Sequence, residues 1–289
     1  MFERFISIDW SGAATEHERV DIRVVQGTSE HGGQVVSPPH TRKGTKSWTR
    51  AECRKWLAEV LEQDRSRCLI VMDFGFGFPW GADRAAFRCQ GWREMIGAVA
   101  EVYGEQSYRE QRWAEFTAEE INSRIAGPGP YRFGQDRANF RFYLDYEIAY
   151  YRLVEVVVPQ AMSQWYFPKG PRVASSTITG MAALDCLMRI REQEKIDFQV
   201  WPQEDLVPNA GKHILVESYP AIYPELPDYG PCTDENCQDA WRVLQWMLTK
   251  ADAGTLESTF EIAPKPFGRV KGISFEDQVR FEGWILGVL

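Results

Sequence analysis

The chain lacks the sequence patterns of a zinc protein and of a membrane protein. Its six cysteines form no Cys-x-x-Cys pair and its four histidines are scattered, so no zinc site is expected. Cys232 and Cys237 could approach each other, but their spacing has no metal or redox signature. No apolar stretch is long enough to cross a bilayer, and the first residues show no signal-peptide pattern. We therefore expect reduced, mostly buried thiols in a cytoplasmic protein that does not contact a membrane.

An excess of positive charge is also missing. The 289 residues include 33 Lys and Arg against 41 Asp and Glu, which gives a net charge of −8 at pH 7. This balance argues against broad, charge-driven binding of nucleic acid, although it leaves room for a local basic channel. The hydrophobic content of 44% is ordinary for a globular protein, and no internal repeat is present. We expect one domain over residues 1–289 with a core of normal size.

Three short apolar runs each end in one carboxylate and are followed by a turn. They are residues 5–8 before Asp9, residues 69–72 before Asp73, and residues 213–216 before Glu217. Runs this short, bounded by Gly and Pro, are typical of strands buried on both faces. In an open α/β sheet, ligands bind beyond the carboxyl ends of the strands. Three acids there would repel one another unless a cation, usually a divalent metal, lay between them.

The order of the expected elements is three strands, then helix, strand, helix, strand and helix. The expected strands are 5–8, 18–26, 33–36, 69–72 and 213–216, with a short one at 198–201. One helix is expected to begin at Ser47 or Thr49, another follows a loop at 175–180, and the last two span 234–250 and roughly 275–287. This is the order of the ribonuclease H-like fold, an α/β fold with a mixed five-stranded sheet flanked by helices. In that fold strands one, four and five are neighbours, so Asp9, Asp73 and Glu217 would converge. The helix after the fifth strand offers Asp234 or Asp239 as a fourth acid.

The segment from about 81 to 172 has a different composition from the rest of the chain. It is rich in Arg and aromatic residues, and Gly-Pro-Gly-Pro at 127–130 interrupts it. Helices are expected near 91–103, 115–125 and 138–158. We interpret the segment as a largely helical insertion or cap of the single domain.

Six short motifs, in order along nearly the whole chain, carry a resemblance to a known family. They lie at 8–13, 72–79, 176–181, 200–202, 216–220 and 282–288. With these motifs the chain resembles the domain-of-unknown-function family 429, whose members are predicted ribonuclease H-like nucleases. In that family the late helix carries Asp-His-x-x-Thr/Gln-Asp-Ala. Asp239 and Ala240 match this motif, whereas Glu235 and Asn236 depart from it.

The resemblance and the acids together predict a metal-dependent nuclease or phosphodiesterase. Two Mg²⁺ or Mn²⁺ ions would activate water and stabilise the leaving oxygen, because hard cations prefer oxygen ligands. Asp9 is the expected bridging ligand, and Asp73, Glu217 and Asp239 complete the catalytic and metal-binding set. The substrate is either nucleic acid or a smaller phosphorylated molecule. The expected substrate contacts are Ser11, Gly75, Gly77, Lys169, Arg172 and Thr177.

Simpler explanations exist for each acid. A single carboxylate at a strand end is more often a turn or cap residue than a ligand. An acid in the first turns of a helix, such as Asp239, also complements the helix dipole. Glu282 could be a ligand, but a surface salt bridge or a structural contact is the stronger interpretation. Gly75 and Gly77 are explained by close backbone approach or a turn.

Two other functions compete with hydrolysis. Asp9-Trp10-Ser11-Gly12 and residues 73–77 faintly resemble the phosphate-binding turns of actin-like ATPases and sugar kinases, although that architecture normally needs two such domains. A protein-kinase interpretation of Asp73-Phe74-Gly75 fails, because the other kinase motifs are missing from the sequence. The third possibility is a non-catalytic binding module whose acids form a structural centre.

Overall fold

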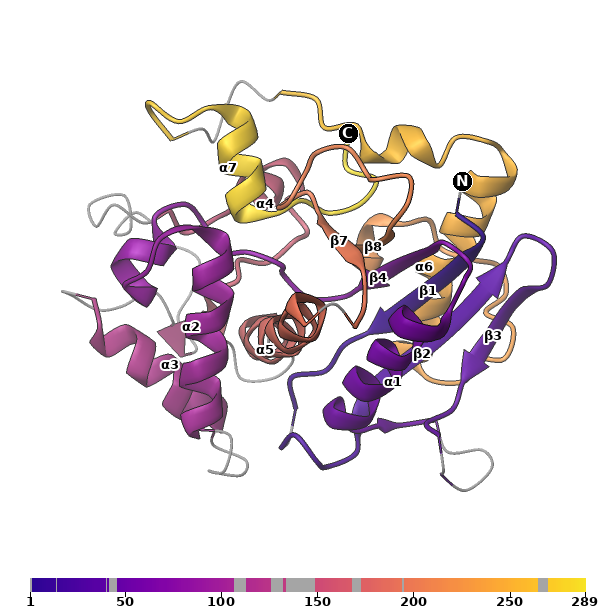
Figure 1. Cartoon of the computed structure of the whole chain (residues 1–289), viewed down its shortest axis with the longest axis horizontal. Helices are drawn as coiled ribbons and strands as arrows, with labels where there is room; N and C mark the ends of the chain where they lie inside the picture. Colours follow the sequence, from indigo (N-terminus) through magenta and orange to yellow (C-terminus); the bar gives the residue numbers. More distant parts are fainter. Residues whose placement is uncertain are drawn as a thin grey trace.

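The structure is a computed structural model of the chain. It describes residues 2–13, 15–39, 41, 46–106, 113–125, 132–133, 149–167, 173–193, 195–264 and 270–289. Figure 1 shows a sheet on one side of the molecule and a helical part on the other.

The centre of the fold is a mixed sheet of six strands in the order β3-β2-β1-β4-β8-β7. The strands are β1 (Arg4–Asp9), β2 (Val20–Thr28), β3 (Gly32–Val36), β4 (Cys68–Met72), β7 (Phe198–Trp201) and β8 (His213–Glu217). The first three are antiparallel, while β1, β4, β8 and β7 run parallel. The predicted adjacency of the three acid-bearing strands is therefore confirmed.

The prediction of five strands is wrong, because the short strand β7 joins the sheet as a sixth. All four of its residues are buried, and it pairs in parallel with β8 from Phe198 opposite His213 to Trp201 opposite Val216. Without β7, one edge of β8 would bury unpaired backbone groups, which is costly. The sequence predicted the strand itself but not the pairing.

Helices cover both faces of the sheet. Helices α1 (Arg50–Gln63) and α5 (Val173–Glu192) lie on one face, and α6 (Glu235–Asp252) lies on the other (Figure 1). The residues of β4 alternate between the two cores: Ile70 and Met72 face α1 and α5, whereas Leu69 and Val71 face α6. This alternation follows from the two-residue period of a strand and explains why the run is apolar at every position.

The helix expected from Ser47 or Thr49 begins with Thr49 as its N-cap. The Thr49 hydroxyl accepts from the backbone N–H of Glu52, and the Glu52 carboxylate accepts from the backbone N–H of Thr49. This reciprocal pair is a capping box, which satisfies two of the unpaired N–H groups of the first turn.

The segment 81–172 is largely helical in its described parts. It contains η1 (Asp83–Phe87), α2 (Gly91–Gln106), α3 (Trp113–Ser123), α4 (Leu153–Val157) and a two-stranded sheet of β5 (Arg132–Phe133) and β6 (Tyr166–Phe167). The helices expected at 91–103 and 115–125 are confirmed. The helix expected at 138–158 lies partly outside the described residues. In the described part of this range, residues 149–158, only the short α4 is helical. Trp92 and Met95 of α2 belong to the same core as Ile70 and Met72 of the sheet.

Residues 175–180, expected to form a loop, belong to helix α5 instead. The Thr179 hydroxyl donates to the carbonyl oxygen of Ser175 at 2.9 Å, as Ser and Thr often do within helices. Gly180 packs against the ring of Phe74, so closely that a Cβ would lie 2.3 Å from its Cγ. Burial of this face therefore overrides the loop-like composition of the segment.

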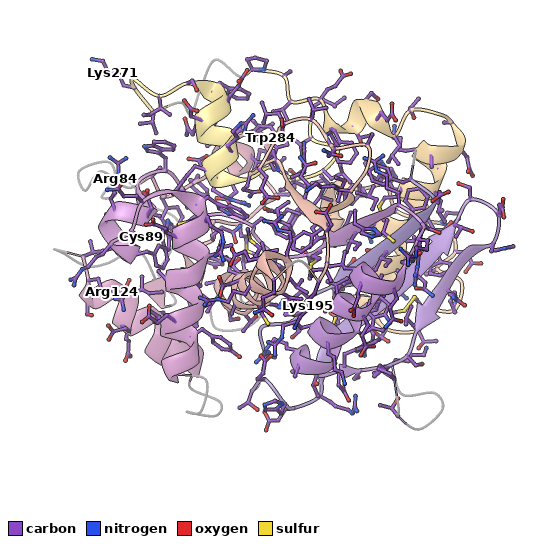
Figure 2. All side chains as sticks on the ribbon, viewed as in Figure 1. Arg84, Cys89, Arg124, Lys195, Lys271 and Trp284 are labelled. Atoms are coloured by element: carbon purple, nitrogen blue, oxygen red, sulfur yellow. A yellow bond between two sulfur atoms is a disulfide. The ribbon has the colours of Figure 1, made fainter. Side chains whose placement is uncertain are left out.

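The last helix, α7 (Phe275–Glu282), is shorter than expected. Gly283 ends it with a φ of 83°, a conformation that favours glycine. The chain then turns back to the sheet, where Ile285 forms a parallel bridge with Glu217. Trp284 is fully buried in this region, whereas Arg84 and Lys271 project at the periphery (Figure 2). Two 3₁₀ turns, η4 (Pro220–Ile222) and η5 (Glu257–Phe260), complete the fold.

One cysteine prediction is wrong, because Cys232 and Cys237 form a disulfide. Their Cα atoms are 5.2 Å apart, a separation that a disulfide can bridge. The turn before α6 creates this proximity: Asp234 caps the helix by accepting from the backbone N–H of Cys237 at 3.1 Å. Cys53, Cys68, Cys89 and Cys186 are free, as expected. Among the described helices, none combines the length and the apolar composition needed to cross a bilayer.

Candidate active site

A cavity of about 810 Å³ opens at the carboxyl ends of the parallel strands. Asp9 at the end of β1, Asp73 directly after β4 and Glu217 at the end of β8 all line it, and Asp239 of α6 lines it as well. The structure therefore brings the four predicted acids to one place. Their positions follow from the sheet order, because parallel strands end at the same edge.

Asp9 and Asp73 are in direct contact. The two positions are held in register by a backbone hydrogen bond from the Asp73 N–H to the carbonyl oxygen of Ile8, at 3.0 Å. Their side chains are also close enough for a hydrogen bond between the two carboxyls, which lowers the pKa of Asp73. A hydrogen bond between two carboxyls needs a proton on one of them, so this pair favours binding a proton over carrying two negative charges.

The environment of this pair disfavours two negative charges. Burial, followed by the negative charges of Asp73 and Asp239, raises the pKa of Asp9 well above its usual range, although Arg23 opposes the shift. Burial, followed by Asp239 and Glu217, raises the pKa of Asp73 to about 8. A cation between the carboxyls would remove both the repulsion and the need for the proton.

Asp239 faces the pair from helix α6. It lies one turn inside the helix, is half-buried, and its pKa is raised by burial. Arg242, one turn further on, places its Nη2 3.8 Å from Asp239 Oδ1 and opposes that shift. Asp239 therefore adds negative charge across the cavity from Asp9 and Asp73, as expected for a third acid of the site.

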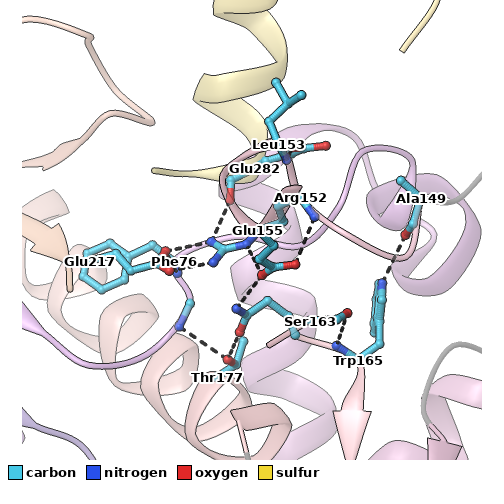
Figure 3. A network of polar contacts seen from close by, with 12 residues as sticks. Phe76, Ala149, Arg152, Leu153, Glu155, Ser163, Trp165, Thr177, Glu217 and Glu282 are labelled. Carbon is cyan, nitrogen blue, oxygen red and sulfur yellow. Dashed lines mark hydrogen bonds and ion pairs between the residues drawn. The ribbon is translucent and has the colours of Figure 1, made fainter. Parts of the chain in front are cut away.

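Glu217 lines the cavity but is held by another side chain. Both of its carboxylate oxygens accept from the guanidinium of Arg152, at 2.6 and 2.7 Å, and Oε2 also accepts from the backbone N–H of Phe76 at 2.9 Å (Figure 3). Glu217, which the sequence predicts as a metal ligand, thus already has a cationic partner within the protein.

The second candidate from the α6 region, Asp234, has a structural role. Besides capping α6, its carboxylate lies 3.1 Å from Nε of Arg23, the residue opposite Asp9 in the antiparallel pair. Asp234 is not among the residues that line the cavity. The remaining acid, Glu282, is fully buried and accepts from the backbone N–H groups of Trp80 and Leu153 at 2.9 and 2.6 Å. It is thus a structural contact and not a surface salt bridge.

The structure describes four of the six predicted substrate contacts, and two of these four line the cavity. Ser11 and Gly75 line the cavity, whereas Gly77 and Thr177 do not. Gly77 packs on the end of α7, since a Cβ there would lie 2.4 Å from the carbonyl oxygen of Glu282. Thr177 is fully buried and accepts from the Gly75 N–H at 3.4 Å.

Two further predicted contacts, Lys169 and Arg172, lie outside the described residues. The close-approach explanation of the glycines is supported by the structure, because neither Gly75 nor Gly77 has a positive φ and a Cβ at either would clash.

Three residues of the cavity were missed at the sequence level. Arg152 lies in the segment 81–172, which has no pattern that would single it out. Arg242 follows Asp239 by three residues, and this helical spacing could have indicated that both face the same side. Ser218 follows Glu217 directly, is almost fully buried, and lines the cavity beside the acids.

Only some of the four acids are arranged in a way that suits a bound cation. Among the residues that the structure describes, no group of three or more His, Cys, Asp or Glu side chains is arranged to hold a metal ion. Asp9 and Asp73, however, offer hard oxygen atoms in direct contact, and Mg²⁺ is commonly bound by one or two carboxylates with waters completing its shell. The donor set therefore fits an ion on Asp9 and Asp73, with Asp239 nearby, but not a shell that includes Glu217.

Comparison with known proteins identifies no relative of this chain. None of the protein-family models, curated proteins or solved structures searched matches the chain. The resemblance to family 429 therefore stays a prediction, and function has to be argued from the site itself.

Proposed function

We propose that the protein is a metal-dependent phosphodiesterase that uses Mg²⁺ or Mn²⁺ and has a ribonuclease H-like fold. The observation that carries the proposal is the contact between Asp9 and Asp73 at the ends of neighbouring parallel strands, inside a cavity that Asp239 also lines. Two carboxyls with raised pKa values in one cavity are typical of a site that performs chemistry or binds a cation.

The chain's own residues supply the binding of the ion and the shape of the site. Asp9 and Asp73 are proposed as the ligands, and Asp239 as the third acid that faces them. When bound, the cation would polarise the phosphoryl oxygens and offset the negative charge that develops on them. Ser11 and Ser218 line the same cavity and can donate hydrogen bonds to a phosphate there.

A small phosphorylated molecule is the favoured substrate class. Arg152 and Arg242 are the cationic residues among the described residues that line the cavity, and each is paired with carboxylates: Arg152 with Glu217, and Arg242 with Glu225 at 2.8 Å. A long polyanion needs several free cations along its path. The cavity volume of about 810 Å³ lies within the range of small-molecule sites.

The competing phosphotransferase proposal is weakened by the turn after β4. Its predicted phosphate-binding glycines are used within the protein, since the Gly75 N–H donates to Thr177 and Gly77 packs on Glu282. Stabilisation of the protein by ATP with Mg²⁺ would favour that alternative.

Hydrolysis assays with matched variants test the proposal. A chromogenic phosphodiester, a cyclic dinucleotide and a single-stranded oligonucleotide are offered with Mg²⁺ or Mn²⁺ to the wild type, Asp9→Asn, Asp73→Asn and Asp197→Asn. Asp197 is the control because it precedes β7 at the opposite end of the sheet and its side chain is 64% exposed. We expect hydrolysis to need the cation and to fall by more than about 100-fold in the first two variants, since loss of even an outer-sphere partner costs up to that much.

The control Asp197→Asn should keep wild-type activity. Cation-dependent hydrolysis that persists in both Asp9→Asn and Asp73→Asn would contradict the proposed site. Absence of hydrolysis of every phosphodiester offered, by a folded wild type that binds the cation, would favour the non-catalytic binding module.

A further inference from the structure

Arg152 and Glu217 form a buried ion pair at the edge of the cavity. Arg152 is the N-cap residue of α4 and Glu217 ends β8, so the pair joins the segment 81–172 to the central sheet. Figure 3 shows the guanidinium between Glu217, Glu155 and the end of α7. Both residues also line the cavity that Asp9 and Asp73 line.

Every nitrogen of the guanidinium donates a hydrogen bond. Nη1 and Nη2 donate to the two oxygens of Glu217, Nε donates to Glu155 at 2.8 Å, and Nη1 also donates to the backbone carbonyl of Glu282 at 3.0 Å. Arg152 is fully buried and Glu217 is 3% exposed. Removing Glu217 from this arrangement would leave a buried charge without its main partner, which is strongly unfavourable.

The carboxylate of Glu217 is equally committed. Its Oε2 accepts from both Arg152 and the backbone N–H of Phe76, and its Oε1 accepts from Arg152. A metal ion on Glu217 would have to compete with a guanidinium that stays protonated at any physiological pH. The positive charge that balances Glu217 is therefore already part of the protein.

We propose that Arg152, and not a metal ion, is the permanent counter-ion of Glu217, so that the site holds one divalent cation on Asp9 and Asp73. This inference rests on the proposed function and departs from the two-ion, four-acid arrangement expected from the sequence. Asp73 and Glu217 are both strand-end acids of adjacent strands, and the difference between them lies in their partners. Asp73 meets another acid, Asp9, whereas Glu217 meets a buried arginine.

The number of bound ions tests the inference on the wild type without any substitution. Mn²⁺ is titrated into the full chain and free Mn²⁺ is counted by electron paramagnetic resonance. We expect one bound ion per chain. Two bound ions would overturn the inference and leave the proposed hydrolase intact, whereas no bound ion at millimolar Mn²⁺ would overturn both.

Two single substitutions then test which acid holds the ion. Glu217→Gln removes the charge of Glu217 while keeping its size, and Asp73→Asn does the same at the neighbouring strand. We expect Glu217→Gln to bind one Mn²⁺ with an affinity within about threefold of the wild type, and Asp73→Asn to lose at least tenfold, as loss of a direct ligand should exceed the cost of an outer one. Loss of Mn²⁺ binding in Glu217→Gln equal to that in Asp73→Asn would overturn the inference.

A third variant covers the case in which Glu217→Gln fails to fold. The double substitution Arg152→Gln and Glu217→Gln removes both charges of this pair together, while Glu155 keeps its hydrogen bonds from Gln164 and from the backbone N–H of residue 152. It should keep the single ion and the wild-type circular dichroism spectrum. Loss of the ion by this folded double variant would overturn the inference in the same way.

Discussion

At the scale of single residues, the role of each carboxylate depends on the groups that surround it. Asp9, Asp73 and Glu217 look alike in the sequence, since each ends an apolar run. In the structure, burial and neighbouring acids raise the pKa values of Asp9 and Asp73, whereas Glu217 is neutralised by Arg152. The same residue type at equivalent strand ends thus has two different physical roles.

The raised pKa values predict a pH dependence of cation binding. With the pKa of Asp73 raised to about 8 and that of Asp9 raised well above its usual range, protons compete with a cation at neutral pH. Mn²⁺ should therefore bind more tightly as the pH rises from about 6 to about 8.5, and its binding should release protons. Calorimetry in two buffers of different ionisation enthalpy measures both effects. An affinity that stays constant over this range would show that the pair holds no proton when the ion binds.

Residue pairs of this kind also mark what a sequence can and cannot predict. The acids at strand ends were predictable, because the apolar runs before them have a clear pattern and sheet order brings them together. Arg152 was not, because it is separated from Glu217 by 65 positions and their contact depends on how α4 packs. The disulfide between Cys232 and Cys237 likewise depends on the turn that Asp234 caps.

At the scale of elements, packing decided the cases in which composition was ambiguous. Residues 175–180 have the composition of a loop, yet they form the first turns of α5 because their buried side faces the turn after β4. The apolar strand β7 was predicted, but its place at the sheet edge follows from the pairing needs of β8. Long amphipathic helices such as α2 and α6 were predictable within a few residues, since their pattern is repeated over several turns.

Two glycine substitutions test the packing of α5 against the site. Gly180→Ala would place a Cβ 2.3 Å from the ring of Phe74, which is itself confined by Trp10 and Phe76 with ring centroids 5.7 and 4.9 Å away. We expect a loss of about 1–3 kcal/mol in the free energy of unfolding, as for other overpacked cores, and weaker Mn²⁺ binding because Phe74 follows Asp73.

The matched control is Gly97→Ala in the middle of α2. The nearest atom to a Cβ there is 3.7 Å away, an ordinary contact. The control should stabilise the protein by roughly 0.5–1 kcal/mol, because alanine is the better helix former. Urea unfolding compares the two variants, and equal effects would show that Gly180 has no special packing role.

At the scale of the whole molecule, charge and cavity shape restrict the substrate. The chain carries a net charge of −8, and the cavity is lined by more acids than arginines. Without a cation, this surface should repel polyanions over distances of about a Debye length. A bound divalent ion would offset that charge locally, where a single phosphate group could then approach.

Nucleic-acid binding without metal is therefore predicted to be weak. Fluorescence anisotropy of a labelled single-stranded oligonucleotide, in the presence of a chelator at physiological salt, should give a dissociation constant weaker than about 10⁻⁶ M, the tight end of non-specific binding. Tighter binding that weakens steeply with added salt would show a basic path along the protein and would favour a polymeric substrate over a small one.

The central claim is that Asp9 and Asp73 together hold a divalent cation that Glu217 does not share. Anomalous diffraction from crystals soaked in Mn²⁺ tests it most directly, because the peak locates the ion independently of activity. We expect one peak adjacent to the carboxylates of Asp9 and Asp73, with the Arg152–Glu217 pair unbroken. A peak on Glu217, or no peak at the Asp9–Asp73 pair in crystals that diffract well, would contradict it.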